Sequence, residues 1–232
     1  MKKILNGLII VLVLYPLGMI LGITFTLLRL LGRIEIRNRH HFPPRQKNMI
    51  VVANHPSFLE PVLLPVLFFS EYLRNPFLLP WSTPDIGLVR SIILFWLGPR
   101  AIPVDRSESA TPSRVKSFRR MIKILKEDGR IILFSEGGRT FKQKEWLVSG
   151  KGKKLGKISE GVAFLALKSN SLVLPVWIDG AEDVLPNNKF PWPRFWRGKV
   201  VIKIGQPLRF VNITSHGATK KLSQILLDLA DE

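Results

Sequence analysis

The sequence predicts an α/β fold, a single domain with a mostly parallel mixed sheet flanked by helices, preceded by an N-terminal hydrophobic helical motif. Two observations predict this architecture. Short apolar runs of strand length alternate along the chain with longer helical segments, as in parallel β-α-β units. In addition, residues 4–28 are all uncharged and mostly apolar, between Lys3 and Arg29.

This N-terminal segment is long enough to meet lipid, because a bilayer-spanning helix needs about 20 such residues. It is too long for a signal peptide, and a buried core helix is the alternative. Pro16, with Gly18 and Gly22 close by, leaves open a kinked span or a helical hairpin in one leaflet. The predicted division is a membrane-embedding segment at 1–32 and the α/β domain at 33–232.

The charge of the chain predicts an anionic partner. Lys and Arg number 35 against 17 Asp and Glu, a formal net charge of +18. The apolar N-terminus favours anionic membrane lipids and argues against nucleic acid. The segment from Arg29 to Lys47 is a basic linker with Glu35 as its single acid, which predicts a membrane protein with its main domain on the cytoplasmic face.

Metal and thiol chemistry are not expected. The chain has no cysteine, and its four histidines show no metal-ligand spacing.

After the turn at 42–45, the first predicted strand is "NMIVVAN", which spans 48–54. Two apolar helices, 61–69 and 86–98, and a short strand at 100–105 follow it.

The next segment is an amphipathic helix that begins at Pro112, with Thr111 as N-cap, and is ended by Gly129. Its predicted apolar face comprises Val115, Phe118, Ile122 and Leu125.

The remaining predicted elements are strands at 130–135, 172–178 and 199–204, a helix near 159–169 and a C-terminal amphipathic helix after His216. The Lys-Gly run at 150–157 lacks the spacing of a phosphate-binding loop, so it is expected to be a cationic flap or a solvated linker.

His55 and Glu60 form the first candidate site, at the point where the strand ends in "NHPSFLEP". Ligands of open α/β sheets sit at such strand ends. A turn at Pro56 allows the Glu60 carboxylate to accept from one imidazole nitrogen, which fixes the tautomer and leaves the other nitrogen as a base. The substrate must then provide the nucleophilic hydroxyl. Asn54 and Ser57 are expected to bind substrate and help to hold the base, whereas a purely structural histidine is the alternative.

The second candidate site is "LFSEGGRTF", where the strand ends in a Gly-rich turn. Gly137 and Gly138 allow backbone N–H groups to approach a ligand, and the guanidinium of Arg139 suits a phosphate. A third strand ends in "VDR", where Arg106 provides another cation or pairs with Asp105.

Four motifs resemble the glycerolipid acyltransferases of the lysophosphatidic acid type. "NHPSFLEP" (54–61) resembles their block N-H-x-x-x-x-D-P, and "GPRAIPVDR" (98–106) resembles the block that ends F-I-D-R. "FSEGGR" (134–139) is similar to F-P-E-G-T-R, and "LPVWI" (174–178) is similar to V-P-V-x-I. Their order and spacing agree over roughly residues 30–210.

The resemblance implies an enzyme that transfers an acyl chain from a thioester of coenzyme A or acyl carrier protein to a lysophospholipid. The acceptor that it implies is 1-acyl-glycerol-3-phosphate, and the product is phosphatidic acid. The implied roles are a general base (His55), its orienting carboxylate (Glu60), acceptor-phosphate ligands (Arg106 and Arg139) and residues that shape the acceptor pocket (Glu136, Gly137 and Gly138). It also implies an N-terminal motif embedded in one leaflet. No cofactor beyond the thioester co-substrate is expected.

Three positions depart from the family motifs: Glu60 stands in place of Asp, Ser135 in place of Pro and Gly138 in place of Thr. These departures leave open another lyso-lipid or lipid-linked acceptor, or a non-catalytic relative at the membrane surface.

Overall fold

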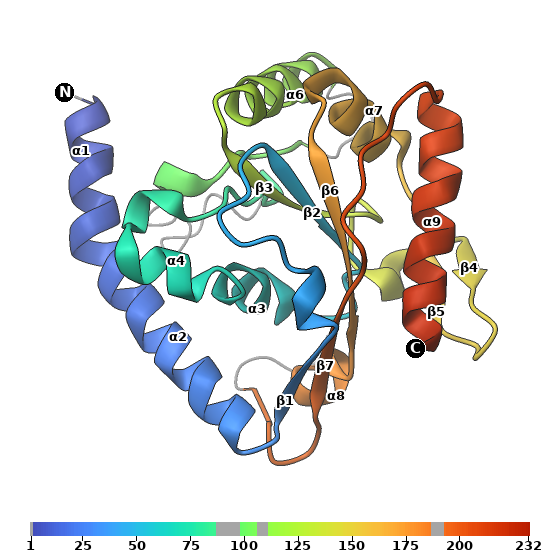
Figure 1. Ribbon diagram of the computed structural model, residues 1–232, viewed down its shortest axis with the longest axis horizontal. Coiled ribbons are helices and arrows are strands. Elements are labelled where there is room, and N and C mark those ends of the chain that lie inside the picture. Colours follow the sequence, from blue (N-terminus) through green and yellow to red (C-terminus); the bar gives the residue numbers. More distant parts are fainter. Residues whose placement is uncertain (1, 87–97, 106–110, 187–192) are drawn as a thin grey trace.

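The core of the computed structural model is a five-stranded sheet (Figure 1), and the structure describes residues 2–86, 98–105, 111–186 and 193–232. The strand order is β1-β7-β6-β2-β3. The strands are β1 (Ile34–Arg37), β2 (Met49–Ala53), β3 (Arg130–Phe134), β6 (Leu172–Asp179) and β7 (Val200–Ile204). All neighbours are parallel except β6 and β7, which confirms the predicted mixed, mostly parallel sheet.

Helices cover both faces of the sheet, so its central strands are apolar throughout rather than alternating. The helices are α1 (Lys2–Ile9), α2 (Tyr15–Leu30), α3 (Glu60–Val66), α4 (Phe69–Arg74), α6 (Thr111–Lys126), α7 (Glu160–Ser169), α8 (Ala181–Val184) and α9 (Ser215–Asp231). Alternate residues of β2 face two separate cores. Ile50 and Val52 pack in the core with α6, α7 and α9, whereas Val51 and Ala53 pack in the core with α3 and α2.

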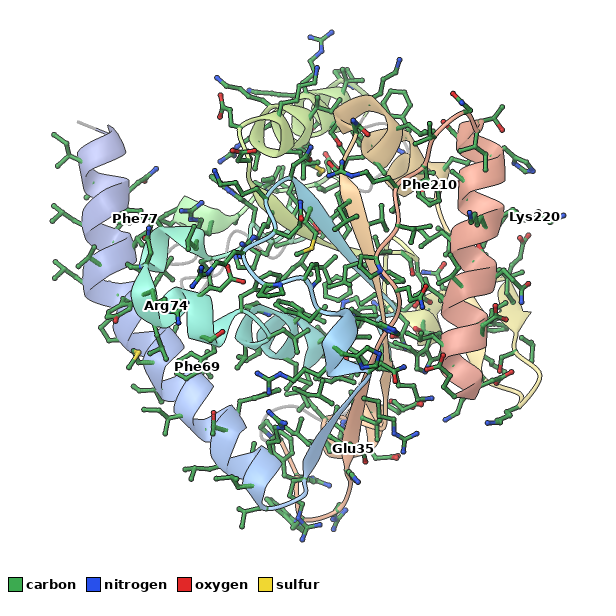
Figure 2. All side chains as sticks on the ribbon, viewed as in Figure 1. Glu35, Phe69, Arg74, Phe77, Phe210 and Lys220 are labelled. Atoms are coloured by element: carbon green, nitrogen blue, oxygen red, sulfur yellow. The ribbon has the colours of Figure 1, made fainter. Side chains whose placement is uncertain are left out.

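The N-terminal segment is one bent helical run and not a hairpin (Figure 1). A π-helical turn, Ile10–Leu14, joins α1 to α2 just before Pro16, whose ring displaces the carbonyl one turn earlier. The stretch Ile4–Leu30 is long and apolar enough to cross a membrane by length and composition alone. Figure 2 shows Phe69 of α4 beside α2, while side chains on the outer side of the helix point away from the domain.

Glycine permits the close packing of α2 on the domain. A Cβ atom at Gly22 would lie 2.1 Å from the ring of Phe69, and one at Gly18 would lie 2.3 Å from the ring of Tyr72. One side of this helix is therefore part of the packed structure.

The predictions for three segments were wrong in detail. The linker contains a strand, β1, in which Ile34 is buried and pairs with Val200. The Lys-Gly run at 150–157 supplies the turn and the second strand of an antiparallel hairpin, formed by β4 (Trp146–Val148) and β5 (Lys154–Gly156). The segment 100–105 forms only isolated bridges, because Pro103 has no N–H to donate to a ladder.

Two predicted helices also differ. The run 61–69 is divided between α3 and α4, with a break at Leu67 and Phe68. In α6, Val115 is exposed and Met121 is buried, since this helix packs against both α7 and the sheet and its buried stripe is rotated from the predicted one. The second apolar helix, 86–98, falls mostly on residues 87–97, outside the described residues.

Candidate active site

Three parallel strands bring the candidate loops to one edge of the sheet. Ala53 of β2 is in register with Phe134 of β3 and Val176 of β6, so the residues after each strand lie side by side. Asn54 then joins the first loop to β6: its Nδ2 donates to the carbonyl of Ile178 at 2.9 Å, and its Oδ1 accepts from the N–H of Ile178 at 2.8 Å. These bonds fix the backbone directly before His55.

His55 and Glu60 are in contact, as the sequence predicts. Nδ1 of His55 donates to Oε2 of Glu60 at 2.7 Å, and the carboxylate is fully buried. The hydroxyl of Ser57 donates to Oε1 of Glu60 at 2.6 Å, and the N–H of Ser57 reaches both oxygens at 3.1 Å. Three donors therefore stabilise the buried charge, and the extra methylene of Glu is accommodated at the first position of α3.

The imidazole keeps its second nitrogen available. The ring of Phe134 stacks on the His55 ring, with 4.0 Å between the ring centroids and an interplanar angle of 18°. This stacking restricts the plane of the imidazole. Nε2 has no hydrogen-bond partner in the described part of the chain, and 11% of the His55 side chain is exposed. A base with a fixed tautomer and one accessible nitrogen suits proton transfer from a hydroxyl.

Glu136 joins three segments rather than standing open to solvent. Its carboxylate accepts from the N–H of His55 at 3.0 Å, the hydroxyl of Thr140 at 2.7 Å and the N–H of Gly156 at 2.9 Å. Burial raises the pKa of Glu136, and these donors oppose the shift. Glu136 thus holds the His55 loop, its own loop and the β4–β5 hairpin together.

Arg139 lies on the same loop, between two aromatic rings. Its guanidinium carbon is 3.9 Å from the ring centroid of Phe58 and 4.9 Å from that of Phe141. Partial burial lowers the pKa of Arg139, and the negative charge of Glu60 opposes this shift. Such stacking uses the face of the guanidinium group and restricts the orientation of its plane.

The other predicted residues have mixed outcomes. Gly137 has a φ of +64°, and a Cβ atom there would meet nothing within 4 Å, while Gly138 continues the turn. The observed contacts of Asn54 and Ser57 are with protein, so a substrate contact for either one remains a prediction. Arg106 lies outside the described residues.

Sequence reasoning did not find Gly156. A Cβ atom at this position would lie 2.4 Å from Oε2 of Glu136, so only glycine allows the hairpin to approach. In the sequence, Gly156 is one of three glycines in the Lys-Gly run, and nothing local distinguishes it from the other two.

Two hollows lie beside the His55 loop. One of about 220 Å³ is lined in part by Phe134, Ser135 and Gly137. The other, of about 390 Å³, is lined in part by Asn54 and Phe141. In the described residues, no three His, Asp or Glu side chains are grouped as metal ligands.

Comparison with known proteins identifies the type of enzyme. The model of the family described as Acyltransferase matches residues 33–179, which include the whole His55, Glu60 and Arg139 constellation. The chain belongs to this acyltransferase family. The fold of the acyltransferase is similar to the crystal structure of the 1-acyl-sn-glycerophosphate (LPA) acyltransferase, PlsC, from Thermotoga maritima. The TM-score is 0.65 at 19% sequence identity, over 87% of this chain and 72% of the other.

Proposed function

We propose that this acyltransferase moves a fatty acyl chain from a thioester of coenzyme A or acyl carrier protein to the hydroxyl of 1-acyl-glycerol-3-phosphate, giving phosphatidic acid. The observation that carries the proposal is the 2.7 Å contact between His55 and Glu60, with Nε2 accessible and the guanidinium of Arg139 on the adjoining loop. Together they provide a base for a hydroxyl and a cation for a phosphate.

In the proposed reaction, Nε2 of His55 accepts the proton of the acceptor hydroxyl while the hydroxyl oxygen attacks the thioester carbonyl carbon. Glu60 stabilises the imidazolium that forms. The tetrahedral intermediate then collapses, the C–S bond breaks, and the departing sulfur takes the proton from Nε2. The products are an ester and a free thiol. Base catalysis of this kind contributes typically ~10² to 10⁴ in rate.

The phosphate monoester of the acceptor is proposed to bind Arg139, with Arg106 as a second cation. A guanidinium donates two parallel hydrogen bonds to a phosphate, so it orients the ligand as well as attracting it. Glu136 is proposed to shape the acceptor pocket indirectly, because its buried carboxylate fixes the loop that carries Arg139.

Membrane attachment is proposed to occur through the N-terminal helix, in one leaflet. The helix packs along the domain, with Ile10, Leu14 and Phe25 buried, while Leu12, Ile20 and Leu27 on its outer side are exposed. A helix that crossed the bilayer in this arrangement would draw the charged domain into the hydrocarbon, at high cost. The basic residues after the helix favour anionic lipids of the cytoplasmic leaflet. Protease access in oriented vesicles tests this placement.

The decisive experiment is an acceptor panel with the full-length protein in detergent. Thiol release from acyl-coenzyme A is measured with 1-acyl-glycerol-3-phosphate, lysophosphatidylglycerol and lysophosphatidylethanolamine, with His55→Ala as control, and acyl carrier protein is tested as second donor. We expect the highest kcat/KM for the phosphate monoester. An equal or higher kcat/KM for lysophosphatidylglycerol or lysophosphatidylethanolamine, which are phosphate diesters, would mean that the acceptor is another lyso-lipid.

A further inference from the structure

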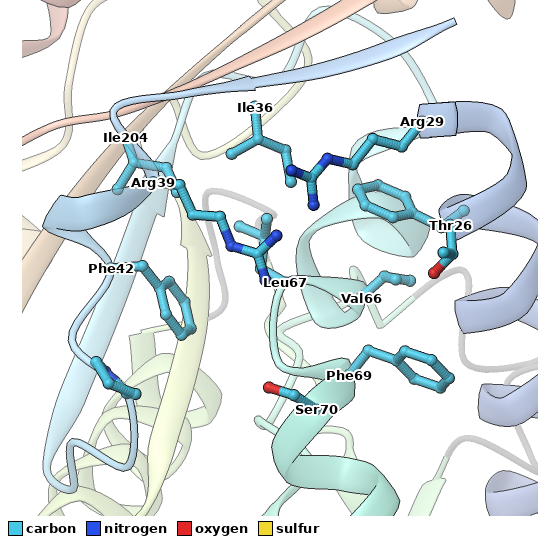
Figure 3. Close-up of a pocket in the computed structure, with 12 residues that line it drawn as sticks. Thr26, Arg29, Ile36, Arg39, Phe42, Val66, Leu67, Phe69, Ser70 and Ile204 are labelled. Atoms are coloured by element: carbon cyan, nitrogen blue, oxygen red, sulfur yellow. The ribbon is translucent and has the colours of Figure 1, made fainter. Parts of the chain in front are cut away.

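A groove lies between the end of α2, strand β1, the turn Arg39–His41 and the junction of α3 with α4 (Figure 3). Its volume is about 340 Å³, within the roughly 300–1,000 Å³ typical of small-molecule sites. It is lined by Phe25, Thr26, Arg29, Ile36, Arg39, Phe42, Pro44, Val66, Leu67, Phe69, Ser70 and Ile204. Aromatic and aliphatic side chains dominate this lining, and none of its residues is acidic.

Two guanidiniums converge on this groove. Figure 3 shows Arg29, from the last turn of α2, and Arg39, from the turn after β1, pointing toward one another above Leu67. Neither guanidinium forms an ion pair or a hydrogen bond with any other residue that the structure describes. Two acids adjoin the lining residues in sequence, and both are paired elsewhere. Glu71 is buried and paired with Arg130 at 2.6 Å, and Glu35 is paired with Arg37 and Lys199. Two positive charges directed toward one another repel. An anion bound between them attracts both, so the net electrostatic energy of the three groups becomes favourable.

The groove also has an apolar floor, beside a helix whose outer side is apolar and exposed. Phe25 and Leu67 contribute to this floor, and Leu27, Leu30 and Leu31 near the end of α2 are exposed. A ligand that contacts both the two arginines and the apolar floor carries a negative charge at one end and hydrocarbon at the other. Inorganic phosphate would satisfy the arginines and leave the floor uncovered.

We propose that this groove binds one diacyl phospholipid with an anionic head group, its phosphate between Arg29 and Arg39 and part of an acyl chain on the apolar floor. The site is separate from the acceptor site. Glu60, the first residue of α3, contacts His55, whereas Val66, its last residue, lines the groove, and a helix of this length spans about 10 Å. The inference therefore does not depend on which lipid the enzyme acylates.

The test compares two double variants of the full chain with equal net charge. Arg29→Gln/Arg39→Gln removes both guanidiniums from the groove. Arg33→Gln/Arg45→Gln removes two exposed charges from the same linker that do not line it. Each detergent-purified protein is titrated with phosphatidylglycerol or phosphatidylcholine, and bound lipid is counted by native mass spectrometry. Thermal unfolding midpoints verify folding.

We expect the native protein and the control variant to bind one phosphatidylglycerol with the same Kd. The groove variant should bind it at least about tenfold more weakly, or about 1.4 kcal/mol. Millimolar inorganic phosphate should not displace the lipid. Each single variant, R29Q or R39Q, should lose part of the affinity, which provides the same comparison if the double variant unfolds.

Three results would overturn the proposal. Equally weakened phosphatidylglycerol binding in both double variants would mean that the lipid responds to general surface charge. Equal affinity for phosphatidylcholine and phosphatidylglycerol would mean that the groove binds acyl chains without recognising the head group. Displacement of the lipid by inorganic phosphate would mean a bare anion site.

Discussion

Replacement of Glu60 by Gln tests whether the buried carboxylate orients the base. The carboxylate accepts from Nδ1 of His55 and from the hydroxyl and N–H of Ser57. An amide has only one oxygen for these donors. If its NH₂ group faces His55, the ring must accept at Nδ1 and carry its proton on Nε2, which removes the base. If its oxygen faces His55, the NH₂ group opposes the N–H of Ser57, and the negative charge is lost in either case.

The expected loss in turnover is at least about 10²-fold, which is about 2.7 kcal/mol of transition-state stabilisation. The corresponding Asp-to-Asn change in a serine protease triad costs about 10⁴. We expect a smaller effect here because the ring of Phe134 holds the imidazole plane independently of Glu60.

The assay is thiol release at saturating donor and acceptor, with unfolding midpoints as the measure of folding. His55→Ala should abolish measurable turnover, and Glu60→Asp should retain a substantial fraction because it keeps the charge. Near-normal turnover in a well-folded Glu60→Gln protein would refute the orienting role. The carboxylate would then only favour the N-terminus of α3 through the helix dipole, worth under about 1 kcal/mol.

Three further predictions concern the surrounding structure. Arg139→Ala should raise the KM of the acceptor more than that of the donor, and an unchanged acceptor KM would exclude a phosphate ligand at this position. Gly156→Ala places a methyl group against Glu136, so it should lower stability by about 1–3 kcal/mol and reduce turnover; a native unfolding midpoint would show that the hairpin shifts freely. The ion pair with Lys199 lowers the pKa of Glu35 from 4.5 to about 2, so its contribution to stability is present above the ordinary pKa and is lost as pH falls toward 2. The difference in unfolding midpoint between the native protein and Glu35→Gln should therefore shrink over that range, and a constant difference would contradict the assignment.

The central strands were predictable from the sequence, whereas the edge of the sheet was not. Strands β2, β3 and β6 are apolar runs that end in polar turns, which is a local signal. β1 is a four-residue strand in which Glu35 and Arg37 alternate with isoleucines, within a basic segment. Its partner begins at Val200, so only a long-range pairing distinguishes it from a linker.

The same distinction between local and long-range signals applies to the site. His55 and Glu60 are five residues apart, at the two ends of a short loop that contains Pro56, so their contact followed from the sequence. The contact of Gly156 with Glu136 depends on a hairpin that returns to the sheet edge, and the stacking of Arg139 on Phe58 depends on the register of β2 with β3. Neither contact has a local pattern.

The pairing of β1 with β7 has a consequence for synthesis. Among the strands that the structure describes, β1 lies at the edge of the sheet and pairs with β7, which spans residues 200–204. A ribosome exposes β1 well before β7, so the strand lacks this partner until the residues between the two strands have emerged. During that interval its N–H and C=O groups are an open template for other strands. The apolar helix immediately before β1 leaves the ribosome ahead of it, so capture of that helix by lipid or by a chaperone would shield this edge until β7 arrives.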